Sequence, residues 1–149
     1  MTVEERPRTP GMRLLITDPT AVVVDSADIT SLRAEDETGS FGILPGHADM
    51  LTVLTTSVVL WRHTDGKPGY CAVRRGVLSV QGGKEIAIAT RDAQRGDDLE
   101  TLETQVLARF LAEAEAERAG RVAAMRLHTQ AIRRIIEALR ANGPTDIGA

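Results

Sequence analysis

Cysteine is almost absent from this chain, because Cys71 is the only one among 149 residues. A single thiol excludes an internal disulfide framework and a metal site built from several thiolates, and it fits a reducing compartment. Aromatic residues make up only 3% of the chain, which argues against sugar binding and against stacking on unpaired bases. No run of eighteen apolar residues occurs. The sequence therefore predicts no membrane-spanning helix and a soluble cytoplasmic protein.

Positive charge is not in excess either, since 18 Lys and Arg residues stand against 21 Asp and Glu. The net charge of −3 disfavours a whole-chain attraction to nucleic acid. Catalytic combinations are lacking too. His47 is followed by Asp49, but no serine, cysteine or second histidine completes a recognisable site, so a structural or interface role is favoured. Gly82-Gly83-Lys84 is followed by Glu85 and not by the Ser or Thr of a P-loop, which favours a hairpin turn. We expect no catalytic residue, no metal and no cofactor.

Short apolar runs separated by turn residues extend from Arg13 to about Thr90. Turns are indicated at Asp18-Pro19, Asp36–Gly39, Asp65–Gly69 and Gly82–Lys84. This spacing predicts eight to ten short strands in an antiparallel sandwich or barrel. We assign the sandwich to residues 12–95 and a loose leader to residues 1–11.

The pattern changes after Arg95-Gly96. Asp97 or Asp98 can cap a helix, and apolar residues then recur every three or four positions. Gly120 is the only glycine between Gly96 and Gly143, and we take it as the break between two helices that fold back on each other. The sequence thus predicts an antiparallel helical hairpin over residues 96–141 and a flexible tail over 142–149.

Charge divides sharply between the two expected helices. Residues 98–117 carry six acids and one arginine, whereas residues 118–140 carry six arginines and one glutamate. Two interpretations remain open: the acidic and basic helices pair within the hairpin, or the arginines also meet an acidic surface on a partner. The two arrangements could alternate.

The most distinctive segment is Gly39–Thr52, in which glycines and a proline shape the backbone and nothing indicates a nucleophile paired with a base or a metal-ligand pair. This composition indicates a contact surface. Its core, Phe41-Gly-Ile-Leu-Pro-Gly-His-Ala48 followed by Leu51-Thr52, resembles the signature of the ε subunit of F-type ATP synthase. Two further motifs, Arg75–Val80 and Ala93–Leu99, are similar to that family's later strand and its sheet-to-helix junction. The resemblance covers about residues 12–140, and the departures from the commonest pattern also resemble ε subunits of the alternate, sodium-type bacterial ATPases.

The resemblance implies a ten-stranded antiparallel β-sandwich followed by a two-helix hairpin. It implies a non-catalytic rotor subunit of the central stalk, which couples rotation of the c-subunit ring to the catalytic head by contacting γ. The carboxy-terminal helices would inhibit ATP hydrolysis when their basic residues face an acidic loop of the β subunit. The location implied is peripheral, on the cytoplasmic face of the bacterial inner membrane, without insertion into the bilayer.

The residues that the resemblance assigns fall into three groups. The γ-contacting group is Pro45, Gly46, His47 and Asp49, where Asp49 replaces the family's usual proline. The loop expected to face the c ring holds Glu35, Asp36, Glu37 and Thr38. The candidate inhibitory residues are Arg126, Arg133 and Arg134.

Some bacterial members of the family bind ATP at the hairpin through an Ile/Leu-Asp-x-x-Arg-Ala motif. The matching stretch here is Leu99–Thr104, in which Glu103 stands where the arginine is expected. Because an acid repels phosphates, we expect no strong ATP binding at this site. The alternatives to a rotor subunit are a nucleotide-sensing switch and a β-sandwich adaptor whose basic helix binds another acidic partner.

Overall fold

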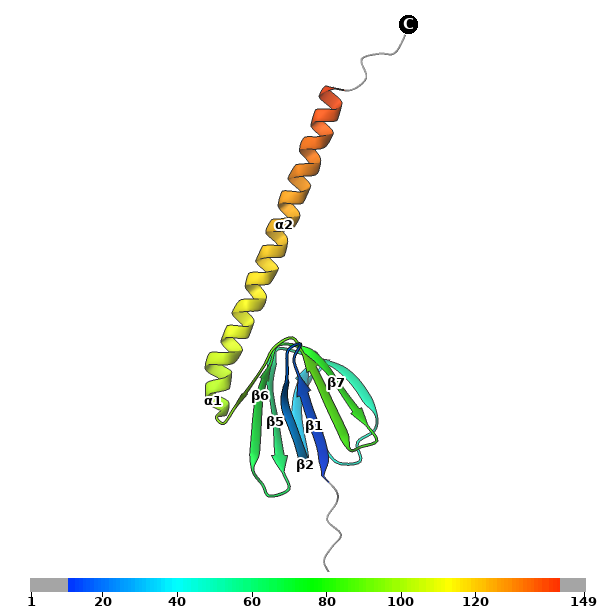
Figure 1. The fold of residues 1–149 in the computed structure, drawn as a ribbon, viewed down its shortest axis with the longest axis vertical. Helices are drawn as coiled ribbons and strands as arrows, with labels where there is room; N and C mark the ends of the chain where they lie inside the picture. The colour runs from blue at the N-terminus through cyan, green and yellow to red at the C-terminus, as the bar shows by residue number, and fades with distance from the viewer. Residues whose placement is uncertain (1–10, 143–149) are drawn as a thin grey trace, which may run out of the picture. The chain divides into compact units, whose positions relative to one another are not determined.

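The computed structural model describes residues 11–142, and in this range the strands precede the helices, as expected (Figure 1). The strands are β1 (Met12–Thr17), β2 (Val22–Asp36), β3 (Gly39–Ile43), β4 (Met50–Leu54), β5 (Ser57–His63), β6 (Pro68–Val73), β7 (Gly76–Gln81), β8 (Glu85–Thr90) and β9 (Ala93–Gly96). The helical part consists of α1 (Leu99–Thr101), a π-helical turn η1 (Leu102–Val106) and α2 (Leu107–Ala141). Apart from Gly11 and Asn142, the predicted leader and tail lie outside the described residues.

Strand β2 is 15 residues long and belongs to both layers of the sandwich. Its first part pairs with β1, and its second part pairs with β3 and β5. The strand continues through Asp28, although this residue has a φ of 58°. The described residues contain nine strands, which is within the eight to ten that the spacing predicts and one fewer than the ten that the resemblance implies.

The strands form a closed arrangement in the order β1-β8-β7-β4-β2-β5-β6-β9, with β3 on β2 and β1 also on β2. All pairs are antiparallel except β1 with β8, which is parallel. The expectation of a wholly antiparallel sandwich is wrong at this pair. A parallel pair requires a long connection between its two strands, and here the whole chain between Thr17 and Glu85 provides it.

Burial alternates along the strands, as in β8, where every second residue is buried. The inward-facing residues form one aliphatic cluster around Trp61, which is 2% exposed. A Cβ on Gly69 would lie 2.1 Å from the Trp61 ring, so only glycine leaves room for the indole. The indole N–H donates to Nε2 of His63 at 3.3 Å. The single cysteine, Cys71, is buried in this cluster, and burial raises the pKa of its thiol to about 12.

The beginning of the helical part packs on the outer surface of the sandwich. Of the two expected capping residues, Asp98 is the one used, because its carboxylate accepts from the backbone N–H groups of Glu100 and Thr101. A second cluster then forms between the helical segment and strands β5 and β6; its buried members are Val58, Ala72, Leu102, Val106 and Phe110. The first compact unit therefore continues past the expected boundary at residue 95 and ends at Leu111.

The second compact unit begins at Ala112 and contains the rest of α2. Helix α2 continues through Gly120, so the structure shows one helix in place of the expected two-helix hairpin. Gly120 does not interrupt the helix, because a glycine weakens a helix by only about 1 kcal/mol relative to alanine. No proline lies near it in the sequence. An ion pair between Arg118 and Glu115, at 4.0 Å, lies within the one helix. No helix in residues 11–142 is both long and apolar enough to cross a membrane.

Candidate functional site

The loop before β4, residues 44–49, is hydrogen-bonded to the turn between β7 and β8. The backbone N–H of Gly46 donates to the carbonyl of Gly83 at 2.9 Å. A Cβ on Gly83 would lie 2.6 Å from Cα of Gly46, and both glycines have positive φ. Oδ1 of Asp49 accepts from the backbone N–H of Gly82 at 2.8 Å. Two of the four residues expected at the γ contact thus position the loop itself, and the turn predicted at Gly82–Lys84 is confirmed.

His47 is half-buried in this loop and is held by its own neighbours. Its backbone N–H donates to the carbonyl of Leu44 at 3.1 Å, and Nδ1 lies 2.7 Å from the carbonyl oxygen of Ala48. Because a carbonyl only accepts, Nδ1 carries the proton in this contact. Within residues 11–142 no hydrogen bond or ion pair joins the side chains of His47 and Asp49, and these residues contain no cluster of three or more metal-ligating side chains. The geometry favours a structural and surface role for His47 over catalysis.

The β2–β3 loop is organised by Asp36. Its Oδ1 accepts from the backbone N–H and the hydroxyl of Thr38, and its Oδ2 accepts from the hydroxyl of Thr52 at 2.8 Å. These bonds hold the pKa of the Asp36 carboxyl below its usual value, the hydroxyl of Thr38 contributing most. Asp36 is therefore a fixed support, whereas Glu35, Glu37 and Thr38 are exposed.

Strand β4 connects these two regions and carries an apolar surface that the sequence did not reveal. Leu51 and Val53 on β4 and Val77 on β7 are 73%, 53% and 43% exposed. They belong to two rows across the sheet, Leu51-Ser79-Ala87 and Val53-Val77-Ala89. We call the surface formed by these six residues the β4–β7 face.

The β4–β7 face continues into the β2–β3 loop. A shallow groove of about 630 Å³ includes Glu37 and Thr38 together with Leu51, Val53 and Val77. The structure thus places the expected c-ring-facing loop beside apolar residues that follow directly on the expected γ-contacting loop. The only signal for this surface in the sequence is that Met50–Leu54 is almost entirely apolar, so that apolar residues occupy both faces of the strand.

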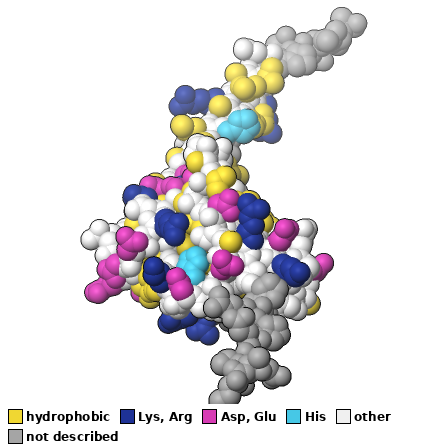
Figure 2. All heavy atoms as spheres, turned by 60° about the horizontal axis from the view of Figure 1, so that its bottom comes forward, with side chains coloured by type: hydrophobic (Ala, Val, Ile, Leu, Met, Phe, Trp, Pro, Cys, Tyr) yellow, Lys and Arg dark blue, Asp and Glu magenta, His cyan; other side chains and the backbone are white. Residues whose placement is uncertain are grey.

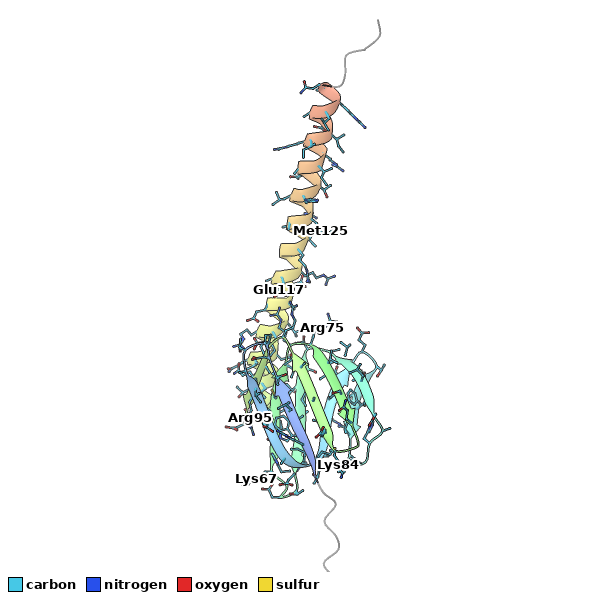
Figure 3. All side chains as sticks on the ribbon, turned by 45° about the vertical axis from the view of Figure 1, so that its right-hand side comes forward. Lys67, Arg75, Lys84, Arg95, Glu117 and Met125 are labelled. Atoms are coloured by element: carbon cyan, nitrogen blue, oxygen red, sulfur yellow. The ribbon has the colours of Figure 1, made fainter. Side chains whose placement is uncertain are left out.

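The candidate inhibitory arginines are exposed on α2. Arg126 and Arg133, seven residues apart, lie on one stripe of the helix, and Arg134 lies about 100° further round. The helix also carries a stripe of exposed apolar residues at spacings of three, seven, four and three: Val122, Met125, Ile132, Ile136 and Leu139. Met125 is labelled in Figure 3, where side chains extend from the helix in all directions.

Charge on the sandwich is mixed. The end of the molecule that faces the viewer in Figure 2 carries Lys and Arg side chains interspersed with Asp and Glu. A single-sign field of the kind that attracts a nucleic acid backbone is not visible on this face. Short-range contacts by shape and apolar area are the interactions that this surface can provide.

Comparison with known proteins agrees with this geometry. A family model described as "ATP synthase, Delta/Epsilon chain, beta-sandwich domain" matches residues 11–96. The chain is 46% identical over 132 residues to the ATP synthase epsilon chain 2 of Paraburkholderia xenovorans, covering 89% of this chain and 95% of the relative. The chain belongs to the ATP synthase delta/epsilon family. As its motifs predicted, it is a non-catalytic accessory subunit of the ATP synthase complex.

Further matches extend the comparison. The ATP synthase epsilon chain 2 of Cereibacter sphaeroides is 41% identical over 134 residues, covering 89% of this chain and 92% of the relative. A chain in the cryo-EM structure of the Euglena gracilis mitochondrial ATP synthase has the same fold, with a TM-score of 0.55 and 19% identity. That match covers 78% of this chain and 70% of the other.

Proposed function

We propose that this subunit couples c-ring rotation to the catalytic head through the β4–β7 face, which contacts the γ subunit. The supporting observation is the exposure of Leu51, Val53 and Val77 on a sandwich whose other large apolar residues are mostly buried. Contiguous apolar surface of this kind marks protein contacts in soluble proteins. Pro45, Gly46, His47 and Asp49 lie in the loop that leads into this face, and the Gly46 and Asp49 contacts with the β7–β8 turn fix its shape.

The β2–β3 loop is proposed to meet the c ring. Asp36 holds the turn through Thr38 and Thr52, so that Glu35, Glu37 and Thr38 can present polar groups to a partner. Since Asp36 and Thr52 join this loop to β4, a displacement at the c-ring side is passed directly to the proposed γ contact.

Helix α2 is proposed to regulate ATP hydrolysis. In an extended arrangement, Arg126, Arg133 and Arg134 would face an acidic loop of the β subunit. In a folded arrangement, α2 would bend near Gly120 and pair its acidic and basic halves as a hairpin. The uncovered apolar stripe supports both arrangements, because each would bury it.

The first experiment tests the γ contact by pull-down with γ from the same cell. Leu51→Glu combined with Val53→Glu should abolish capture of γ, because two charges would be buried without partners. Val22→Glu is the matched control, since Val22 is 59% exposed on another strand. If the double variant is folded by circular dichroism and still captures γ, the β4–β7 face is not the contact.

The second experiment tests inhibition in the reconstituted ATPase. Changing Arg126, Arg133 and Arg134 to glutamine should raise ATP hydrolysis, whereas the same change at Arg118, Arg121 and Arg140 on the same helix serves as control. Unchanged hydrolysis in the first variant would remove the inhibitory role and leave the coupling role intact.

Nucleotide sensing is not part of the proposal. Glu103 remains exposed near the helix start, and Leu102 is occupied in packing against the sandwich. Isothermal titration of the full chain with ATP should show no micromolar binding. The proposed location is peripheral, on the cytoplasmic face of the bacterial inner membrane.

A further inference from the structure

A separate hollow of about 370 Å³ lies on the outer surface of strands β2, β3, β5 and β6. Its volume is within the range of small-molecule sites, about 300 to 1,000 Å³. The hollow shares no residue with the β4–β7 face or with the β2–β3 loop, so it is independent of the proposed γ and c-ring contacts.

The walls of the hollow are largely apolar. Leu60 and Tyr70, neighbours across β5 and β6, are half-buried, and Leu44 at the edge is 62% exposed. Trp61, the only tryptophan, also contributes to the lining.

The opening exists because one strand position has no side chain. Gly42 pairs with Arg33 across β3 and β2, and both line the hollow. A Cβ added to Gly42 would meet only the carbonyl oxygen of Leu32, at 3.8 Å, and its φ is not positive. A larger residue at this position would therefore extend into the hollow without straining the backbone.

Two cations flank the apolar walls. Arg33 and Arg62 both line the hollow, and its lining includes no Asp or Glu. Within residues 11–142 neither guanidinium forms a salt bridge; Nη1 of Arg62 donates only to the carbonyl of Gly66, at 3.5 Å. The hydroxyls of Ser31 and Tyr70 also belong to the lining and add hydrogen-bonding capacity.

We propose that this hollow binds a small amphipathic anion, a carboxylate carried on an aliphatic body. The aliphatic body would cover Leu60 and Tyr70, and the carboxylate would pair with Arg33 and Arg62, which present planar donors suited to it. Charge complementarity selects an anion over a neutral molecule of the same shape, because no carboxylate within residues 11–142 forms an ion pair with either arginine.

The experiment titrates decanoate into the full chain, with calorimetry and Trp61 fluorescence as readouts. We expect saturable binding at one site with a Kd below about 1 mM, and binding of the uncharged analogue decanol at least tenfold weaker. No saturable binding of decanoate, or equal binding of decanol, would overturn the proposal.

Variants locate the binding. Gly42→Val should abolish it by filling the hollow, and Arg33→Glu with Arg62→Glu should weaken it more than tenfold. Arg75→Glu is the matched charge reversal; Arg75 lines the groove of the β4–β7 face and lies at the end of the sandwich away from Lys67 and Lys84 (Figure 3).

Each outcome is decisive. If Gly42→Val and the double arginine variant bind decanoate like the wild type, the ligand sits elsewhere, for example on the apolar stripe of α2, and the proposal is wrong. If Gly42→Val is not folded by circular dichroism, the double arginine variant decides alone. If decanoate fails to bind and the folded Gly42→Val loses γ in the pull-down, the hollow is a protein contact, which contradicts a small-molecule site.

Discussion

Large apolar residues are mostly buried in the sandwich but exposed on helix α2 beyond Ala112. In the sandwich, large residues such as Leu78, Ile88 and Trp61 are at most 2% exposed. On α2, the large apolar residues beyond Leu111 are at least 44% exposed, and the only buried residue of the helix is Phe110. The sandwich therefore supports its own fold, while the helix keeps apolar area for another surface.

The difference can be tested with one chemical change made in each region. Leu78→Ala should destabilise the protein by about 2 to 5 kcal/mol, because it leaves a cavity in a close-packed core. Leu139→Ala, at a residue that is 67% exposed, should change stability by no more than about 0.5 kcal/mol. Urea unfolding followed by Trp61 fluorescence measures both, and equal effects would show that the helix is covered in solution.

Truncated chains test where the boundary between the sandwich and the exposed part of α2 lies. A chain ending at Leu111 should unfold at the same urea concentration as the full chain, since it retains both buried clusters. A chain ending at Asp98 should lose about 2 to 5 kcal/mol, because removing Leu102, Val106 and Phe110 uncovers Val58 and Ala72. Equal stability of the two fragments would mean that the second cluster contributes nothing.

Substitution of Gly120 separates a continuous helix from a hairpin. A Cβ at Gly120 would meet no atom within 4 Å. Gly120→Ala should therefore increase helicity by circular dichroism and stabilise the helix by about 0.5 to 1 kcal/mol. A decrease in helicity would indicate that the isolated subunit uses Gly120 as a turn.

The smallest expected effect concerns acid stability. The pKa of Asp36 is lowered in the fold, so its ionised form contributes stability at neutral pH that is lost as the pH falls through the folded value. Asp36→Asn should reduce the loss of stability between about pH 7 and about pH 3, measured as the urea midpoint. Glu37→Gln is the control, because Glu37 is an exposed carboxylate in the same loop. An unchanged pH dependence in Asp36→Asn would remove Asp36 as a contributor.

Local chemistry made much of the fold predictable from the sequence. Asp65–Gly69 was predicted as a hairpin loop and joins β5 to β6. Gly82 and Gly83 have the positive φ values that the predicted turn requires. The start of the helical region was also predicted, because a capping aspartate acts within three residues of its own position.

The errors arose where the deciding interaction is distant or weak. Asp28 continues β2 with a positive φ although it is not a glycine, and the parallel pairing of β1 with β8 joins residues that are 72 positions apart in the sequence. Gly120 does not end the helix, because one glycine weakens a helix by only about 1 kcal/mol relative to alanine and the surrounding residues include many alanines. The β4–β7 face could not be separated from the core, because a strand with apolar residues on both faces does not show which face is covered.

The continuity of strand β2 affects how the two layers can move relative to each other. One continuous backbone runs through both layers of the sandwich and ends at the β2–β3 loop. Sliding one layer over the other would require changing the backbone dihedral angles of β2 in addition to breaking hydrogen bonds between strands. A load applied at that loop therefore reaches both layers along a single strand.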